Sequence, residues 1–153
     1  MTVIRRPAYS YRADPAVPVF PDDRPVIVFD GHCVMCSSGA RWLLRIDRRR
    51  RFRVLAAQSS LGRALYVHYG LDPEDYETNL LIQDGEAWMR SAAFVRVAAG
   101  LGLPWAAASL LWLLPAALLD RAYNLIARNR FRLFGRSEAC YLAEPGEEDR
   151  FLT

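Results

Sequence analysis

Residues 26–36 read V-I-V-F-D-G-H-C-V-M-C, and this stretch decides the fold. Its first four residues are β-branched or aromatic and show no polar alternation, which predicts a strand buried on both faces. A carboxylate, a glycine, a histidine and two cysteines follow directly. Further along, Ala40, Leu43 and Leu44 recur at helical spacing. The pattern therefore predicts a strand, a turn and an amphipathic helix that begins around the cysteines.

Cys33 and Cys36 are predicted in the first turn of that helix, where thiol chemistry is favoured. The free N–H groups and partial positive charge of a helix N-terminus stabilise a thiolate, the reactive form of cysteine. Cys33 is then the nucleophile that attacks a disulfide, and Cys36, about one turn further, resolves the mixed disulfide. The two thiols carry two electrons themselves, so this chemistry needs no bound cofactor.

The residues beside the cysteines have two interpretations each. His32 can favour the Cys33 thiolate or pass a proton to a departing thiol, or it can be a solvent-facing loop residue. Asp30 can accept N–H bonds from the turn that follows it, or it can accept a proton from Cys36. The residue types alone leave both choices open.

Two other sites use similar patterns. A structural zinc site needs four ligands, and Cys33, Cys36, Cys140, His32 and His68 show no second paired spacing, so only half a site is supported. The apolar strand before an aspartate also resembles the start of haloacid-dehalogenase phosphatases. Their second aspartate is replaced here by histidine, and the chain has no lysine. Neither site is favoured, and we expect no metal.

Composition limits the classes of protein that the chain can represent. With 153 residues and 52% hydrophobic content, it is long enough for one domain with a core. Three cysteines and an N-terminus without an apolar run predict a reducing, cytoplasmic location. The net charge of +3 is too small to indicate nucleic acid binding. The arginines at 48–51 are interpreted as a solvated helix end.

The rest of the chain supplies the remaining elements of an α/β fold. Residues 52–57 predict a second strand, parallel to the first. A helix follows from Ser59 or Ser60, and then a hairpin with an Asp-Gly turn at residues 84–85. The sequence then predicts helical structure to about residue 135. The prediction is a thioredoxin-like mixed sheet, β-α-β-α-β-β-α, with an additional helical C-terminal portion, over residues 25–153. Residues 1–24 predict a poorly ordered arm or an extended strap.

The stretch 97–119 carries no charge and is long enough to span a bilayer. Pro104 and Pro115 interrupt it, which favours two shorter buried helices with room for an exposed apolar patch. Contact with a membrane surface and formation of a homodimer both stay open.

The motif Asp30, Cys33 and Cys36 in F-D-G-H-C-V-M-C resembles that of the DCC family of thiol-disulfide oxidoreductases. The resemblance covers about residues 25–152 and continues through S-S-L-G-R-A-L, the Asp-Gly hairpin, L-G-L-P-W and A-R-N-R-F-R-L-F-G-R. It implies a thioredoxin-like fold that exchanges disulfides with a thiol or disulfide substrate, expected to be a protein, and an external thiol reductant. Compared with thioredoxins, Glu77 or Thr78 takes the place of the cis-proline, which predicts a different substrate groove.

Two C-terminal features have a functional and a structural interpretation. Arg130, with Asn129, Arg132 and Arg136, can form an anion- or thiolate-stabilising patch or can belong to a packed helix end. Cys140 can be a third redox partner or a small buried hydrophobe. The alternative to an oxidoreductase is a non-enzymatic module that binds a protein or a membrane surface, with vestigial or zinc-binding cysteines.

Overall fold

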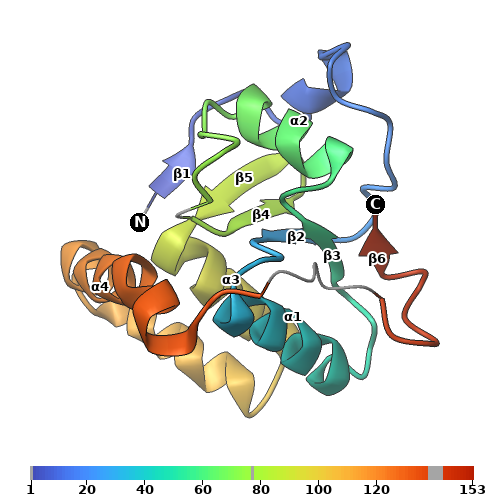
Figure 1. Cartoon of the computed structure of the whole chain (residues 1–153). Coiled ribbons are helices and arrows are strands. Elements are labelled where there is room, and N and C mark those ends of the chain that lie inside the picture. Colours follow the sequence, from blue (N-terminus) through green and yellow to red (C-terminus); the bar gives the residue numbers. More distant parts are fainter. Residues whose placement is uncertain (1, 77, 138–142) are drawn as a thin grey trace.

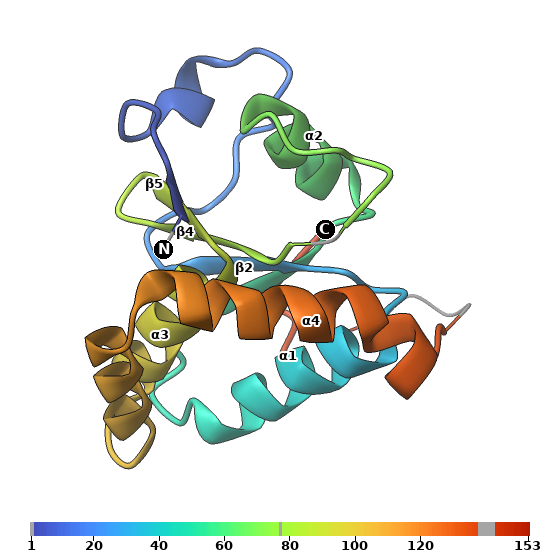
Figure 2. The same ribbon diagram turned by 90° about the vertical axis from the view of Figure 1, so that its left-hand side faces the viewer.

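A computed structural model describes residues 2–76, 78–137 and 143–153 of the chain. A mixed sheet forms the middle layer, with α2 on one face and α1, α3 and α4 on the other (Figures 1 and 2). The strands are β1 (Thr2–Ile4), β2 (Val26–Phe29), β3 (Arg53–Ala56), β4 (Leu80–Gln83), β5 (Glu86–Met89) and β6 (Phe151–Leu152). The helices are η1 (Ser10–Ala13), α1 (Val34–Ile46), α2 (Ser60–His68), α3 (Arg90–Leu101), η2 (Trp105–Leu113) and α4 (Ala116–Phe134).

The sheet has the strand order β1-β5-β4-β2-β3-β6. β2 and β3 are parallel, as predicted for the first βαβ unit, and β4 pairs antiparallel with both β2 and β5. From β2 to α3 the elements follow the predicted β-α-β-α-β-β-α order, so the thioredoxin-like α/β class is confirmed. Two short edge strands were not predicted. β1 pairs antiparallel with β5, and β6 pairs parallel with β3.

The predicted hairpin joins β4 to β5. Asp84 and Gly85 both have positive φ, at 53° and 78°, as a two-residue turn of this type requires. A side chain at residue 85 would collide with Tyr9, whose backbone N–H donates to the Gly85 carbonyl at 2.9 Å. The hairpin thus also anchors the N-terminal segment.

The chain between β1 and β2 packs on the α2 side of the sheet. Tyr11 and Val17 are buried in the same apolar cluster as Leu61 and Leu65 of α2. Asp14 accepts a hydrogen bond from His68 at 2.7 Å. The sequence left open a poorly ordered arm or a strap here, and these contacts place the segment across α2.

A second apolar cluster fills the other side of the sheet. It combines Phe29 and Val54 from the strands with Leu43 and Leu44 of α1, and it includes both cysteines of the motif. The two clusters are separated by the sheet, so the cysteines belong to the core under α1.

The helical C-terminal portion follows the sheet. The chain breaks at Pro104, as predicted, and η2 then runs back along α3. Trp105 packs edge-on against Trp42 of α1, with ring centroids 4.7 Å apart. The expectation of two buried helices over 97–119 is wrong for η2, because none of its described residues is buried. No layer of the described chain covers the outer side of η2. No helix among the described residues has the length and apolarity needed to cross a bilayer.

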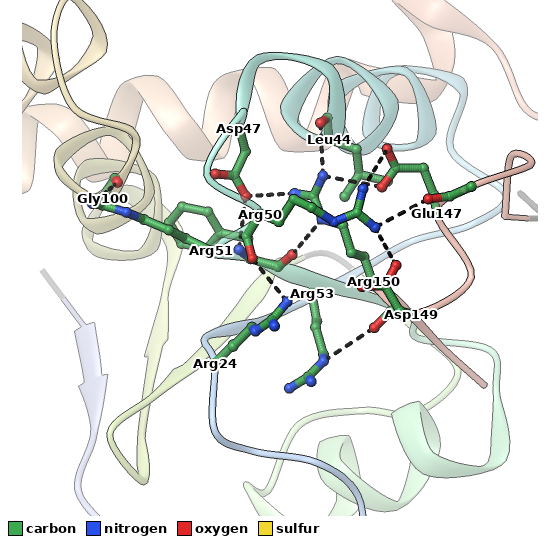
Figure 3. Close-up of polar contacts among 12 residues, drawn as sticks. Arg24, Leu44, Asp47, Arg50, Arg51, Arg53, Gly100, Glu147, Asp149 and Arg150 are labelled. Carbon is green, nitrogen blue, oxygen red and sulfur yellow. Dashed lines mark hydrogen bonds and ion pairs between the residues drawn. The ribbon is translucent and has the colours of Figure 1, made fainter.

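A buried ion pair anchors the C-terminal strand (Figure 3). Arg150 donates to Asp47 at 2.6 Å and to the backbone carbonyls of Leu44 and Phe52. Arg50 and Arg51, from the basic run, donate to the carbonyls of Gly146 and Gly100. These arginines therefore join distant parts of the chain.

Candidate active site

The motif lies where β2 ends and α1 begins. The Cys33 N–H donates to the Asp30 carbonyl at 3.2 Å, and the Ser37 hydroxyl donates to the Gly31 carbonyl at 3.0 Å. Cys33 is the N-cap of α1, and its Sγ accepts the Cys36 N–H at 3.3 Å. This contact is the kind of N-terminal N–H interaction that stabilises a thiolate.

Both cysteines are free thiols and both are buried, Cys33 fully and Cys36 with 8% of its surface exposed. Burial, followed by the hydrogen bond with Cys33, raises the pKa of the Cys36 thiol well above its ordinary value. The negative charge of Asp30 acts in the same direction, and the positive charge of Arg130 acts against it. Cys36 is thus held as a protonated thiol in the resting site.

Asp30 is buried at the end of β2, and its carboxylate is surrounded by donors. Oδ1 accepts the His32 N–H at 3.0 Å and the Gln58 side-chain amide at 2.6 Å. Oδ2 is paired with Arg130 at 3.3 Å. The turn contact is the one expected of a structural aspartate, but the arginine adds a charge partner beside the cysteines.

Arg130 reaches the site from α4, and it is the residue of the predicted arginine patch that does so in the described chain. It also donates to the Tyr76 carbonyl at 2.6 Å. Of its neighbours in the sequence, Asn129 donates to Leu125 within α4, Arg132 is exposed and Arg136 stacks on Phe131. A single buried cation, and not a patch, faces Asp30.

Sequence reasoning missed the contacts that Gln58 and Tyr123 make in the site. Gln58 follows β3, whose carboxyl end lies beside that of β2, so the parallel pairing could have suggested it. Its side chain also accepts the Gly31 N–H at 2.9 Å. Tyr123 of α4 accepts the Asn79 N–H at 3.2 Å, just before β4. Tyr123 therefore occupies the strand entrance that corresponds to the cis-proline region of thioredoxins, while Glu77 lies outside the described residues.

Residues 135–137, which we name the cover segment, lie against His32 and Cys33. Arg136 forms an antiparallel bridge with Cys33, and the Ser137 N–H donates to the His32 carbonyl at 2.8 Å. His32 Nδ1 is 3.2 Å from the Ser137 carbonyl, so this nitrogen carries the proton that is donated. The predicted partner Cys140 lies outside the described residues. His32 and Cys33 thus both contact the cover segment, and Cys33 is fully buried.

Comparisons with known proteins show which family the chain is similar to. The model of the DCC1-like thiol-disulfide oxidoreductases matches residues 27–136, from β2 to the cover segment. The chain belongs to this family. It is 30% identical over 127 residues to the uncharacterized protein YuxK of Bacillus subtilis, covering 83% of this chain and 93% of that protein. It is 33% identical over 122 residues to a chloroplastic DCC family protein of Arabidopsis thaliana, covering 79% and 71%. No solved structure gives a significant match.

The zinc interpretation depends on ligands that come together in space. Within residues 2–76, 78–137 and 143–153, no three histidine, cysteine or acidic side chains are grouped for a metal ion. His68 lies on α2, across the sheet from the cysteines, and is bonded to Asp14 and Ser10. Among the described candidate ligands, His32 is the one that lies next to the two cysteines in the sequence.

Proposed function

We propose that this member of the family is a thiol-disulfide oxidoreductase in which Cys33 is the nucleophile and Cys36 the resolving thiol. The observation that supports it is the position of Cys33 Sγ at the N-cap of α1, where it accepts the Cys36 N–H. That interaction is stronger for a thiolate than for a thiol, because a charged acceptor forms the better hydrogen bond. The helix N-terminus adds its partial positive charge.

In the reductive direction, the Cys33 thiolate attacks one sulfur of a substrate disulfide. A mixed disulfide forms, and the other substrate sulfur leaves as a thiolate that takes up a proton. Cys36 then loses its proton and attacks Cys33 Sγ, which releases the second substrate thiol. The substrate gains two electrons, and Cys33 and Cys36 end as a disulfide. An external thiol reductant restores the dithiol.

The different environments of the two cysteines support this order of steps. The raised pKa of Cys36 keeps it protonated until Cys33 has reacted. Formation of the mixed disulfide removes the Cys33 negative charge, which is one of the causes of that raised pKa. The attack by Cys36 is therefore favoured only after a substrate is bound, and Arg130 supplies a cation that stabilises its thiolate.

Access to Cys33 requires the cover segment to separate from it, since Cys33 has no exposed surface in the described structure. The backbone of residues 32–33 then becomes available for a substrate chain to pair with, as it pairs now with Arg136 and Ser137. We therefore favour an extended protein segment as substrate. A reducing compartment such as the cytoplasm suits the return to the dithiol.

The test is a redox titration of the purified protein in graded thiol-disulfide buffers, with free thiols trapped and located by mass spectrometry. We expect one reversible Cys33–Cys36 transition, at a potential between about −270 and −120 mV. Cys33→Ser and Cys36→Ser should each abolish it, while Cys140→Ser serves as the matched control and leaves it intact. Pairing of Cys33 with Cys140, or stoichiometric zinc in the protein as isolated, would contradict the proposal.

A further inference from the structure

Exposed apolar side chains are concentrated on η2 and α4, where no other part of the described chain covers them. Leu113 and Trp112 of η2 are 82% and 51% exposed, and Leu125 of α4 is 68% exposed. We name this surface the apolar face, and it consists of Leu110, Trp112, Leu113, Leu118, Leu125, Ile126 and Leu133. In Figure 2, η2 (tan) joins α3 to α4 at one end of the layer of helices that lies across the sheet from α2. A large exposed apolar patch marks a surface that binds another protein, a membrane or a ligand.

Arginines border the apolar face along α4. Residues 118, 125 and 132 are seven positions apart, so Leu118, Leu125 and Arg132 lie on one line of the helix. Arg121 and Arg128 follow three positions after the two leucines and lie beside the same line. All three arginines are exposed. From residue 97 to residue 137 the one acidic side chain is Asp120, which accepts a hydrogen bond from Ser91.

This charge pattern argues for an anionic partner. In a symmetric dimer through this face, arginines of one copy would meet arginines of the other without carboxylates to pair them. An anionic bilayer matches both the arginines and the leucines of this surface. Its phosphates pair with the arginines, and its acyl region buries the leucines. Tryptophan at such a surface suits the bilayer interface, where an apolar ring keeps an N–H near water.

We propose that the apolar face docks on the surface of an anionic lipid bilayer, with η2 and α4 lying in the interface and not crossing it. α4 also holds Arg130 against Asp30, so the docked helix is the one that completes the cysteine site. Docking goes beyond the proposed redox function and does not depend on it, since the cysteines take no part in lipid contact.

The test is sedimentation of the full-length protein with vesicles of phosphatidylcholine alone or of phosphatidylcholine with phosphatidylglycerol. We expect binding to the anionic vesicles that weakens as salt is added. Replacing Arg121, Arg128 and Arg132 by glutamine should lower the partition coefficient by about five-fold for each arginine. The pair Trp112→Ser and Leu113→Ser should abolish binding.

Controls come from α2, on the other face of the sheet. Val67→Ser and Arg63→Gln change an exposed apolar and an exposed basic residue there, and they should bind vesicles like the unaltered chain. Thermal unfolding checks that every variant is folded. Equal binding to neutral and anionic vesicles, or none to either, would overturn the proposal. So would a lipid-free dimer that Leu113→Ser converts to a monomer, because the face would then be an interface between copies.

Discussion

At the scale of single residues, the pair of Asp30 and Arg130 is the feature that most distinguishes this site. Both side chains are only 3% exposed, and each has further hydrogen bonds, so the cost of burying two charges is offset by several donors and acceptors. The pair also connects β2 to α4 across 100 positions of sequence. Its charges act in opposite directions on the pKa of Cys36, Asp30 raising it and Arg130 lowering it.

Removing one member of this pair should cost more than removing both. We expect Arg130→Met to lower the free energy of unfolding by about 3–5 kcal/mol, because Asp30 is left buried without its cation. Adding Asp30→Asn should recover part of that loss. Urea unfolding of the two single variants and the double variant measures the coupling. Strict additivity of the two single costs would show that the charges do not stabilise each other.

The sequence predicted the part of the site that is contiguous along the chain. Asp30, His32, Cys33 and Cys36 are set by one strand, one turn and one helix, so their neighbourhood could be inferred from local pattern. Arg130 was a candidate on its motif alone, and its partner could not be inferred, because the pairing depends on how α4 packs across the sheet edge. Gln58 carried no motif.

At the scale of elements, close packing of α2 on the end of β3 depends on a glycine. A Cβ at residue 62 would lie 2.8 Å from the Ala57 Cα, which is backbone and cannot move aside easily. We expect Gly62→Ala to destabilise the protein by about 1–3 kcal/mol despite the better helix propensity of alanine. Gly39→Ala in α1 is the matched control, since nothing lies within 4 Å of that position. It should stabilise the protein by up to about 1 kcal/mol. Thermal unfolding compares them, and equal effects would exclude the packing explanation.

In the proposed function, the cover segment controls access to Cys33. Ser137→Pro removes the N–H that donates to the His32 carbonyl, while Ser137→Ala retains it. The loss of one such bond, about 0.5–1.5 kcal/mol, should raise the alkylation rate of Cys33 about two- to ten-fold if the reaction proceeds through opening. Mass spectrometry of timed iodoacetamide reactions gives the rate. An unchanged rate in the proline variant would mean that Cys33 is reached by another route.

The elements that could be predicted are those with a clear hydrophobic pattern in the sequence. β2, α1 and the Asp-Gly hairpin have patterns set by burial on one or two faces, and they occur where expected. β1 and β6 are only three and two residues long and hold their place through edge pairing, so no local period marks them. The apolar composition of η2 predicted that it is buried. It is exposed because no further helix or strand of the described chain packs on its outer side.

At the scale of the whole molecule, the sheet separates two cores that serve different purposes. The cluster under α1 contains the cysteines, and the cluster under α2 contains Tyr11 and Val17 from the N-terminal segment. The sheet thus lets the core under α2 contribute stability without contacting the cysteine sulfurs. Changes in the N-terminal segment should therefore alter unfolding and leave the redox chemistry unchanged.

Tyr11→Ala tests this separation. Tyr11 is 2% exposed, packs against Phe20 and donates to Asp22, so its loss opens a cavity in the core under α2. We expect a cost of roughly 3–5 kcal/mol in urea unfolding, as for other large aromatic truncations. Val19→Ala, in the same segment but fully exposed, should change stability by less than about 0.5 kcal/mol.

The same two variants decide how the N-terminal segment belongs to the fold. If it is a strap on the core, Tyr11→Ala is destabilised and Val19→Ala is not, and both keep the reduction potential of the Cys33–Cys36 couple. If it were a loose arm, the two variants would unfold alike. A changed reduction potential in Tyr11→Ala would instead show that the sheet transmits packing changes from one core to the other, because Tyr11 belongs to the cluster under α2 and the cysteines to the cluster under α1.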